Sequence, residues 1–568
     1  MKTEFHYDHY FQYQEMKDNI EKLQQKYPHL CKAEIICTTE EKRNVYAVAL
    51  TNQATGAAED KPALYIDGNT HAGEVTGSMA AMHTMDFLLS NYGTDSKATQ
   101  LLDKQTFYII PRISPDGAET YLSTPYELRS VNRPYKPKEG GIAAQDIDQD
   151  GVIRMMRIKS PFGAWKTDPE NPGSVLPREP DDTEGTYYNI FSEGTAQNCD
   201  ALHAEEGKAL WGLDFNRNYP FGWCPDPRQG GAGPYPLSNA ENKAVVDFVL
   251  NHANIAAVAT NHTSGGMILY PPGTRKSSTA AKTDIQNFKT IGQMAKETMG
   301  YDPISIFDTF IEDQVNYDSG AFDDWCYEGQ GIPAYTLELW DLDNRAGVPV
   351  DWNNVHSETL KEQIVRFNAC MNWVKKNAPQ DFLDWKPFNH PVFGDVEIGG
   401  FNSKFTVQNP PTSYLQQEVE KTTAFMVRYA GALPNLKILK VKTVKEAEGI
   451  WKITASVGNV GFLPTWLCEQ ARTIKNSKPV NVSIDTAQAN IISGTKQQDI
   501  GDLSGYSQCN TGVYYYGNIA THPGEPCCKD VSWVIHADDG DSVEICAASD
   551  KGGKVSAAVV LHSDILNA

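Results

Sequence analysis

Apolar runs with strand character alternate with helical segments through the first 340 residues of this chain. The expected strands cover residues 45–50, 63–66, 106–110, 255–260 and 334–340, and the expected helices cover residues 10–27, 75–89 and 238–250. Ser238 and Glu241 also predict a capping box, because each side chain could bond the backbone amide of the other residue. Such alternation is typical of an α/β sheet that is covered by helices on its faces.

The later part of the chain follows other patterns. Residues 134–212 are rich in Pro, Gly and Asp, which predicts an elaborated surface insertion. Beyond Leu433, short alternating strands separated by turn residues are typical of a β-sandwich. We therefore expect three parts: an α/β domain over residues 1–380 that carries the insertion, a connector over 381–432 with a helix at 416–430, and an all-β sandwich over 433–568.

The charge and the end of the chain limit the possible partners. The 568 residues include 50 Lys and Arg against 72 Asp and Glu, which gives a formal charge of −22. That charge repels phosphate backbones and anionic lipid, so neither nucleic acid nor a membrane is an expected partner. The N-terminus lacks the basic and apolar segments of a signal peptide, and the eleven cysteines form no C-x-x-C pair. We expect a cytoplasmic protein with reduced thiols.

An H-x-x-E sequence can supply one imidazole and one carboxylate to a metal ion. Three such sequences occur, at His71–Glu74, His203–Glu206 and His522–Glu525. Only the first follows an expected strand and precedes an expected helix, at the end of a sheet where ligands of α/β proteins bind. The residues alone leave two interpretations of His71 and Glu74 open, a metal site and a structural turn.

Two further segments carry candidate site residues. His262 ends the strand at 255–260, and Glu338 lies within the apolar run AYTLELW. A buried carboxylate in such a strand is either the partner of an ion pair or a general base. The cluster DFNRNY holds Asn216 and Arg217, which offer a fork for a carboxylate unless the cluster is a solvated turn.

Taken together, these motifs resemble those of the zinc metallocarboxypeptidases of the carboxypeptidase A/B family. The resemblance covers about the first 380 residues through HAGE at 71–74, SPDG at 114–117, LRSVNR at 128–133, DFNRN at 214–218, NHTSG at 261–265 and TLEL at 336–339. It implies a mixed twisted sheet flanked by helices and one zinc ion held by His71, Glu74 and His262. It also implies a peptide substrate that ends in a free carboxylate and loses its C-terminal residue.

The resemblance further implies roles in the reaction. Glu338 would be the base and then the proton donor to the leaving amine. Arg129 would polarise the scissile carbonyl, with Arg133 as its rival for that role. Asn216 and Arg217 would hold the terminal carboxylate of the substrate.

Two positions depart from the family pattern or refine it. The family has a mobile tyrosine at a set distance before an Asp-Trp pair. Here that pair is Asp324 and Trp325, and the same distance leads back to Asn316. Tyr317, the next residue, would fill the role only after a one-residue shift. Asp323 occupies the position that, in B-type members, accompanies a preference for a basic terminal residue. We therefore expect removal of a C-terminal Lys or Arg to be favoured.

The insertion contains a possible second cation site. Asp146, Asp148 and Asp150 are spaced like the first half of a calcium loop, followed by Gly151. The position of the usual bidentate glutamate holds Arg157. The segment is therefore either a calcium site that other oxygens complete or a solvated acidic turn.

Two other functions remain open at this point. A zinc amidase or deacylase would use the same metal ligands without needing Asn216 and Arg217, and a cell-wall peptide hydrolase is a further alternative. A binding protein on a peptidase scaffold would need neither the base nor hydrolysis, because a fold alone does not fix a function.

Overall fold

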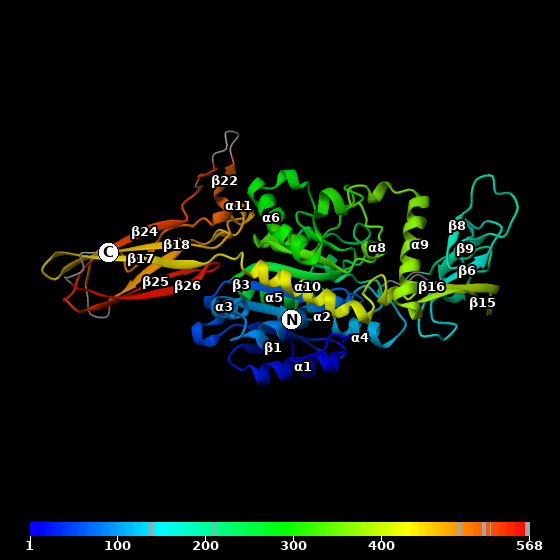
Figure 1. The fold of residues 1–568 in the computed structure, drawn as a ribbon, viewed down its shortest axis with the longest axis horizontal. Coiled ribbons are helices and arrows are strands. Elements are labelled where there is room, and N and C mark those ends of the chain that lie inside the picture. The colour runs from blue at the N-terminus through cyan, green and yellow to red at the C-terminus, as the bar shows by residue number, and fades with distance from the viewer. Residues whose placement is uncertain are drawn as a thin grey trace.

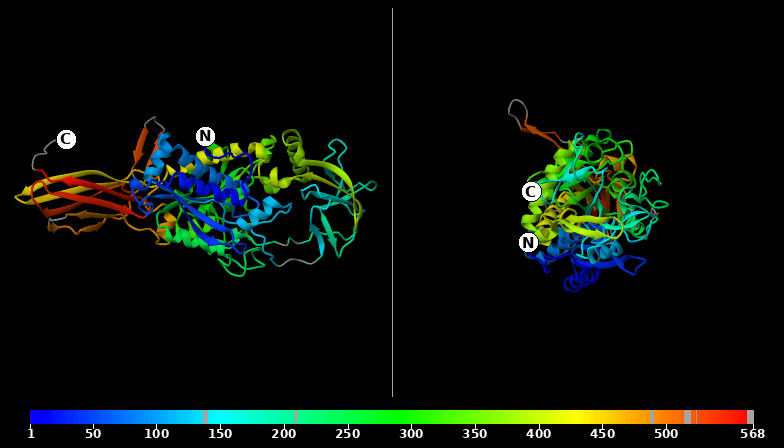
Figure 2. Two further views of the ribbon diagram at one scale, coloured as in Figure 1. Left: turned by 90° about the horizontal axis from the view of Figure 1, so that it is seen from below. Right: turned by 90° about the vertical axis from the view of Figure 1, so that its right-hand side faces the viewer.

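The computed structural model describes residues 1–135, 140–207, 209, 211–486, 490–513, 519–522 and 524–562. The described chain is elongated, with three sets of β-strands in a row along its long axis (Figure 1; Figure 2). A helix-covered sheet lies in the middle, the strands of the insertion lie at one end, and the C-terminal strands lie at the other.

The central sheet has eight strands in the order β1-β2-β4-β3-β11-β14-β12-β13. The pairs β4–β3, β3–β11 and β11–β14 are parallel, whereas β1–β2, β2–β4 and β12–β14 are antiparallel. This is the expected α/β fold with a mixed sheet flanked by helices. The strands are β1 (Cys31–Thr38), β2 (Asn44–Leu50), β3 (Ala63–Gly68), β4 (Thr106–Ile110), β11 (Ile255–Thr263), β12 (Met267–Tyr270), β13 (Asp302–Ser305) and β14 (Ala334–Leu339).

Helices cover the central sheet. Helix α2 is buried along almost its whole length, because α10 packs along it and His83 of α2 bonds Thr423 of α10 at 2.7 Å. This pairing places a late segment of the chain beside the turn that leads into α2. The longer helices of the described chain are α1 (Tyr13–Lys26), α2 (Val75–Asn91), α3 (Ser96–Lys104), α4 (Pro115–Ser123), α5 (Ala240–Asn251), α6 (Lys282–Met299) and α10 (Thr412–Ala430), together with α9 (Leu360–Asn377), which packs against β8 and β15 of the insertion sheet.

The predicted capping box at the start of α5 is wrong. Asn239 is the N-cap residue and makes no capping bond with its side chain. Glu241 instead accepts a hydrogen bond from Arg133 at 2.9 Å, and the Ser238 hydroxyl accepts one from Asn218 at 3.1 Å. Tertiary partners have therefore replaced the local bonds that the sequence pattern predicts.

The insertion forms a six-stranded sheet with a later part of the chain. The order is β15-β16-β6-β9-β7-β8, and β16 pairs with β6 so that Ile398 lies opposite Met156. Residues 381–432 thus supply two strands as well as α10. The strands are β6 (Met155–Lys159), β7 (Trp165–Thr167), β8 (Val175–Pro177), β9 (Tyr188–Ser192), β15 (Phe382–His390) and β16 (Gly394–Phe401).

The C-terminal region is built from β-sheets, as expected. Two four-stranded sheets, β17-β18-β24-β20 and β21-β19-β25-β26, share one core that includes Ile453 and Trp533 from the first sheet and Val482 and Ile545 from the second. Lys551 donates to the carbonyl of Ile255 at 2.7 Å and so joins this region to the start of β11. The strands are β17 (Leu436–Ala447), β18 (Ile450–Asn459), β19 (Asn481–Asp485), β20 (Asn490–Ser493), β21 (Gln497–Asp499), β24 (Cys528–His536), β25 (Ser542–Ser549) and β26 (Gly553–Val560).

None of the helices in the described part of the chain combines the length and the hydropathy that a bilayer crossing requires.

Candidate metal centre and active site

The candidate site lies at the carboxyl ends of three neighbouring parallel strands. His71 and Glu74 follow β3 in the turn that leads into α2, and His262 lies near the end of β11. In the parallel pairing of β11 with β14, His262 is in register with Glu338. Because these ends meet at one edge of the sheet, residues far apart in the sequence come together there.

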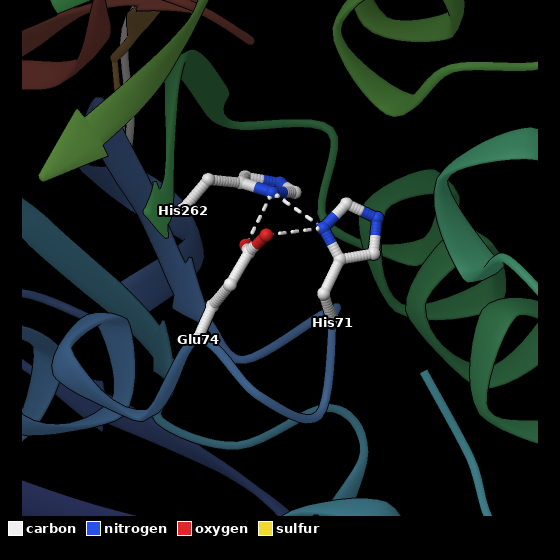
Figure 3. A group of neighbouring side chains, drawn as sticks. All are labelled: His71, Glu74 and His262. Atoms are coloured by element: carbon white, nitrogen blue, oxygen red, sulfur yellow. Dashed lines mark hydrogen bonds and ion pairs between the residues drawn. The ribbon is translucent and has the colours of Figure 1, made fainter. Parts of the chain in front are cut away.

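His71, Glu74 and His262 converge (Figure 3). Nδ1 of His71 lies 2.9 Å from Oε1 of Glu74, and Nδ1 of His262 lies 2.8 Å from Oε2 of Glu74. The two Nδ1 atoms are 3.1 Å apart. Neighbouring ligands of a tetrahedral zinc ion, with bonds of about 2.0–2.1 Å, lie about 3.3 Å from each other. The donor atoms and their spacing therefore fit a zinc ion.

A largely buried carboxylate fixes the orientation of the first imidazole. Nε2 of His71 lies 3.0 Å from Oδ1 of Asp214, whose other oxygen accepts from Nε of Arg129 at 2.9 Å. Burial would raise the pKa of Asp214, but Arg129 and His71 outweigh it and hold that pKa well below its usual range. Because the partner of Nε2 is anionic, the ring proton of His71 lies on Nε2. Nδ1 then keeps the lone pair that a metal ligand needs. Asp214 lies within the DFNRN motif, but nothing in the sequence indicates this contact with His71.

Glu338 has the properties of an acid–base group. Burial raises its pKa to about 8, and the nearby Glu74 carboxylate adds to that rise. His262 and Arg129 lower the same pKa and so lie within electrostatic reach of Glu338. A carboxyl group that titrates near neutrality can both accept a proton and return it.

A residue from far along the chain supports the metal-binding turn. Glu74 is the N-cap residue of α2, yet its side chain makes no capping bond. The Asn409 side-chain oxygen caps the helix instead, accepting from the Thr76 amide at 3.0 Å and from the Thr76 hydroxyl at 2.8 Å. Its NH₂ group donates to the carbonyl of Gly73 at 2.7 Å. Asn409, which is fully buried, thus caps the helix in place of Glu74, whose carboxylate faces the two imidazoles instead.

We expect Asn409→Ala to weaken zinc binding about 10- to 100-fold, because partners that orient metal ligands have effects of that size. Competition with a chromophoric chelator measures the dissociation constant. Asn459→Ala is the matched control, since Asn459 is also buried and donates to two backbone carbonyls, but lies in the C-terminal region. Equal zinc affinity in the Asn409 variant and the parent would contradict this role.

Asn216 and Arg217, which we call the clamp, lie on the turn that carries Asp214. The Asn216 side-chain oxygen accepts from the Phe322 amide at 2.9 Å, so it faces the segment that leads to Asp323. Arg217 forms an ion pair with Asp318 at 2.7 Å. The Arg217 guanidinium therefore binds a carboxylate of this chain, which the sequence reasoning did not anticipate.

The structure places Asp323 beside the strand of the candidate base. Asp323 is buried, and its Oδ2 accepts from the Thr336 hydroxyl at 2.7 Å, two residues before Glu338 on β14. Tyr317 packs against Arg228, and its role as the lid residue stays a prediction. Its ring centroid lies 4.9 Å from Cζ of Arg228, and its carbonyl accepts from the same arginine at 2.8 Å.

Arg133 and the second H-x-x-E sequence are held elsewhere. Both guanidinium nitrogens of Arg133 bond the Glu241 carboxylate, whereas Nη1 of Arg129 lies 3.4 Å from Glu74. His203 is largely exposed and pairs with Asp200 at 2.9 Å. The side chain of His522 lies outside the described residues. Of the two candidate arginines, Arg129 is therefore the one beside the metal-binding group.

The acidic loop of the insertion gathers a different set of carboxylates from the expected one. Asp146 and Asp148 approach Glu193, which the sequence reasoning missed, whereas Asp150 pairs with Arg154 at 3.0 Å. Both oxygens of Asp146 accept backbone amides, from Asp150 at 3.1 Å and from Gly151 at 3.0 Å. Calcium binding at this loop stays a prediction.

This fold and the converging His, Glu and His side chains are those of a zinc carboxypeptidase. A family model for zinc carboxypeptidases matches residues 16–351, and the chain belongs to that family. A second model, described as a domain of unknown function (DUF8731), matches residues 435–560.

Individual relatives are distant in sequence. The chain is similar to carboxypeptidase A4 of Mus musculus, with 22% identity over 339 residues that cover 60% of this chain and 64% of the relative. It is also similar to carboxypeptidase B of Homo sapiens, with 23% identity over 351 residues, 59% of this chain and 64% of the relative. The matched part thus spans less than two thirds of either relative. A crystal structure of thrombin activatable fibrinolysis inhibitor aligns at 20% identity and a TM-score of 0.39, over 66% of this chain and 76% of that one.

Proposed function

We propose that this protein is a zinc-dependent carboxypeptidase that removes the C-terminal residue from peptides. One observation carries the proposal: two imidazoles and a carboxylate have ligand atoms within 4.8 Å of one another, and the strand next to β11 presents Glu338 in register with His262. Membership of the zinc carboxypeptidase family supports the same reaction class.

The chain's own residues divide the work of hydrolysis. A zinc ion held by His71, Glu74 and His262 would supply Lewis-acid polarisation of the substrate carbonyl and of the attacking water. Glu338 accepts the proton of that water and returns it to the leaving amine. Arg129, whose side chain is 43% exposed, donates hydrogen bonds to the oxygen on which negative charge develops.

The clamp residues select the end of the peptide. The ion pair between Arg217 and Asp318 supports this role, because a substrate carboxylate can take the place of the exposed Asp318 carboxylate. Asp323 supports a preference for a basic terminal side chain, since a buried anion favours a cationic partner in a confined pocket.

One digestion experiment tests the clamp and the preference together. Peptides ending in Lys, Phe or Glu, each with a free or an amidated C-terminus, are digested by the parent protein and by Arg217→Ala. We expect the parent to cleave the free peptide ending in Lys fastest. We expect Arg217→Ala to lose about 10- to 100-fold in kcat/KM on free termini, the effect of one lost charged hydrogen bond, and little on amidated ones.

The control variant and the contrary outcomes are specific. Arg428→Ala removes another arginine that pairs with a carboxylate, Glu297 at 2.7 Å, and is expected to behave as the parent does. A clear preference for Phe would overturn the role of Asp323. Loss of activity of the same size on free and amidated peptides would overturn the clamp and favour an amidase or deacylase.

A further inference from the structure

Two cavities lie beside the candidate active site. The first has a volume of about 230 Å³ and is lined by Ser264 and Gly265, which directly follow β11. The second has a volume of about 370 Å³ and is lined by Tyr126 and Glu127, just before Arg129 in the chain. Each cavity therefore reaches a segment that positions a candidate site residue.

The two cavities share one apolar wall. Phe367 of α9, Phe401 of β16 and Val407 line both of them. The rings of Phe367 and Phe401 meet edge to face with centroids 5.3 Å apart, and Val407 is 40% exposed. Because the same three side chains line both of them, the two cavities are adjacent, and we call the pair the upstream groove. The second cavity is also lined by Met155, Ile190 and Phe191 of the insertion sheet.

The upstream groove is separate from the clamp. In the described chain, none of the residues that line it comes from 214–217 or 318–323, the segments that would hold the terminal carboxylate. When the C-terminus of a peptide lies in the clamp and its scissile carbonyl lies near Arg129, the residues before the cleaved bond still need a binding site. The groove is lined by Glu127, two residues before Arg129, and by Ser264, which directly follows β11, so it offers a place for those residues.

Four carboxylates also line the groove, those of Glu127, Glu206, Asp341 and Asp343, and each already accepts a hydrogen bond from this chain. The two arginines of the groove have carboxylate partners. Arg366 pairs with Glu358 at 2.6 Å, and Arg154 pairs with Asp150 at 3.0 Å. Neither arginine is left to attract a charged peptide side chain. The side chains shared by both cavities are two phenylalanines and a valine, so the gain from binding comes from burial of apolar surface.

We propose that the upstream groove binds the peptide substrate before its cleaved bond and selects a large apolar side chain there. The inference rests on the proposed carboxypeptidase function. Phe367, Phe401 and Val407 lie beyond residue 351, where the match to the family model ends. The preference therefore rests on residues outside that match.

A series of peptides in which one phenylalanine occupies successive positions tests the groove. Peptides that end in the same residue carry one Phe at successive positions in a run of alanines, and each kcat/KM is compared with that of the all-alanine peptide. At one position we expect a gain of about 10- to 100-fold, the effect of burying one large apolar side chain. A flat series would overturn the proposal.

A matched pair of variants locates the effect. Val407→Trp fills the groove from its exposed side. We expect the ratio of kcat/KM between the Phe peptide and the all-alanine peptide to fall to about one, because the indole occupies the space that the peptide side chain needs. Val392→Trp places the same side chain at an exposed valine between β15 and β16 and should keep the gain. A gain that persists in Val407→Trp would place the apolar subsite elsewhere and overturn the proposal.

A binding measurement separates this inference from the proposed function. Fluorescence anisotropy with the zinc-loaded Glu338→Gln protein compares the best Phe peptide with the all-alanine peptide, with and without Val407→Trp. Tighter binding of the Phe peptide that disappears with Val407→Trp supports the groove, even if the parent hydrolyses nothing, in which case only the proposed function fails. Equal binding of both peptides overturns the groove.

Discussion

Glu338→Gln is expected to lower kcat/KM for peptide hydrolysis by about 10²- to 10⁴-fold, while zinc stays bound. The amide keeps the shape of the side chain but can neither take a proton from the attacking water nor return one to the leaving amine. The three metal-binding side chains are unchanged, so zinc content should match that of the parent. Steady-state kinetics and elemental analysis of the same preparation measure both quantities.

Glu241→Gln is the control for this variant. Glu241 is also a buried carboxylate, but its partner is Arg133 and not the metal-binding group. We expect this variant to keep the parent's kcat/KM, with some loss of thermal stability from the weakened ion pair. Full activity in Glu338→Gln would mean that another group is the general base, and the mechanism proposed above would have to be abandoned.

His262→Ala should lose both the metal and the activity. Without this imidazole only His71 and Glu74 remain, one ligand fewer than the three that catalytic zinc sites use. We expect zinc content to fall toward zero after dialysis against a weak chelator and kcat/KM to fall by more than about 10³-fold, because the Lewis acid supplies several kcal/mol to the transition state.

A second histidine provides the comparison. His252 lies three residues before the start of β11, whereas His262 lies one residue before the end of that strand. The two histidines are therefore at opposite ends of β11. His252 packs against Phe248, with tilted rings whose centroids lie 4.0 Å apart. His252→Ala should keep its zinc and its activity. A His262→Ala protein that still holds one zinc per chain would show that the ion binds elsewhere.

The sequence predicts the position of the metal ligands because parallel strands end at one edge of a sheet. The strand predicted at 255–260 nevertheless continues to Thr263. The prediction stopped where Asn261 and His262 interrupt the apolar run, as polar residues usually mark the end of a buried strand. Both are buried here, since their partners are the Asp67 carbonyl and the metal-binding group.

Long-range pairings had no local signal in the sequence. Strand β16 meets β6 with Glu397 opposite Arg157, about 240 residues earlier in the chain. Glu193 reaches the acidic loop in the same way, in place of the Asp150 that local spacing suggested. Asn409 stands in the segment QNPP, which is typical of a loop and gives no sign of a contact with Gly73.

The contact between Asn409 and Gly73 has a consequence for the order of events during synthesis. The two residues are 336 positions apart, so the turn that presents His71 and Glu74 leaves the ribosome long before its support exists. Strands β3 and β4 can already pair at that stage, but the start of α2 stays uncapped. The metal-binding geometry is therefore completed late, when the segment leading into α10 has emerged and folded back onto α2.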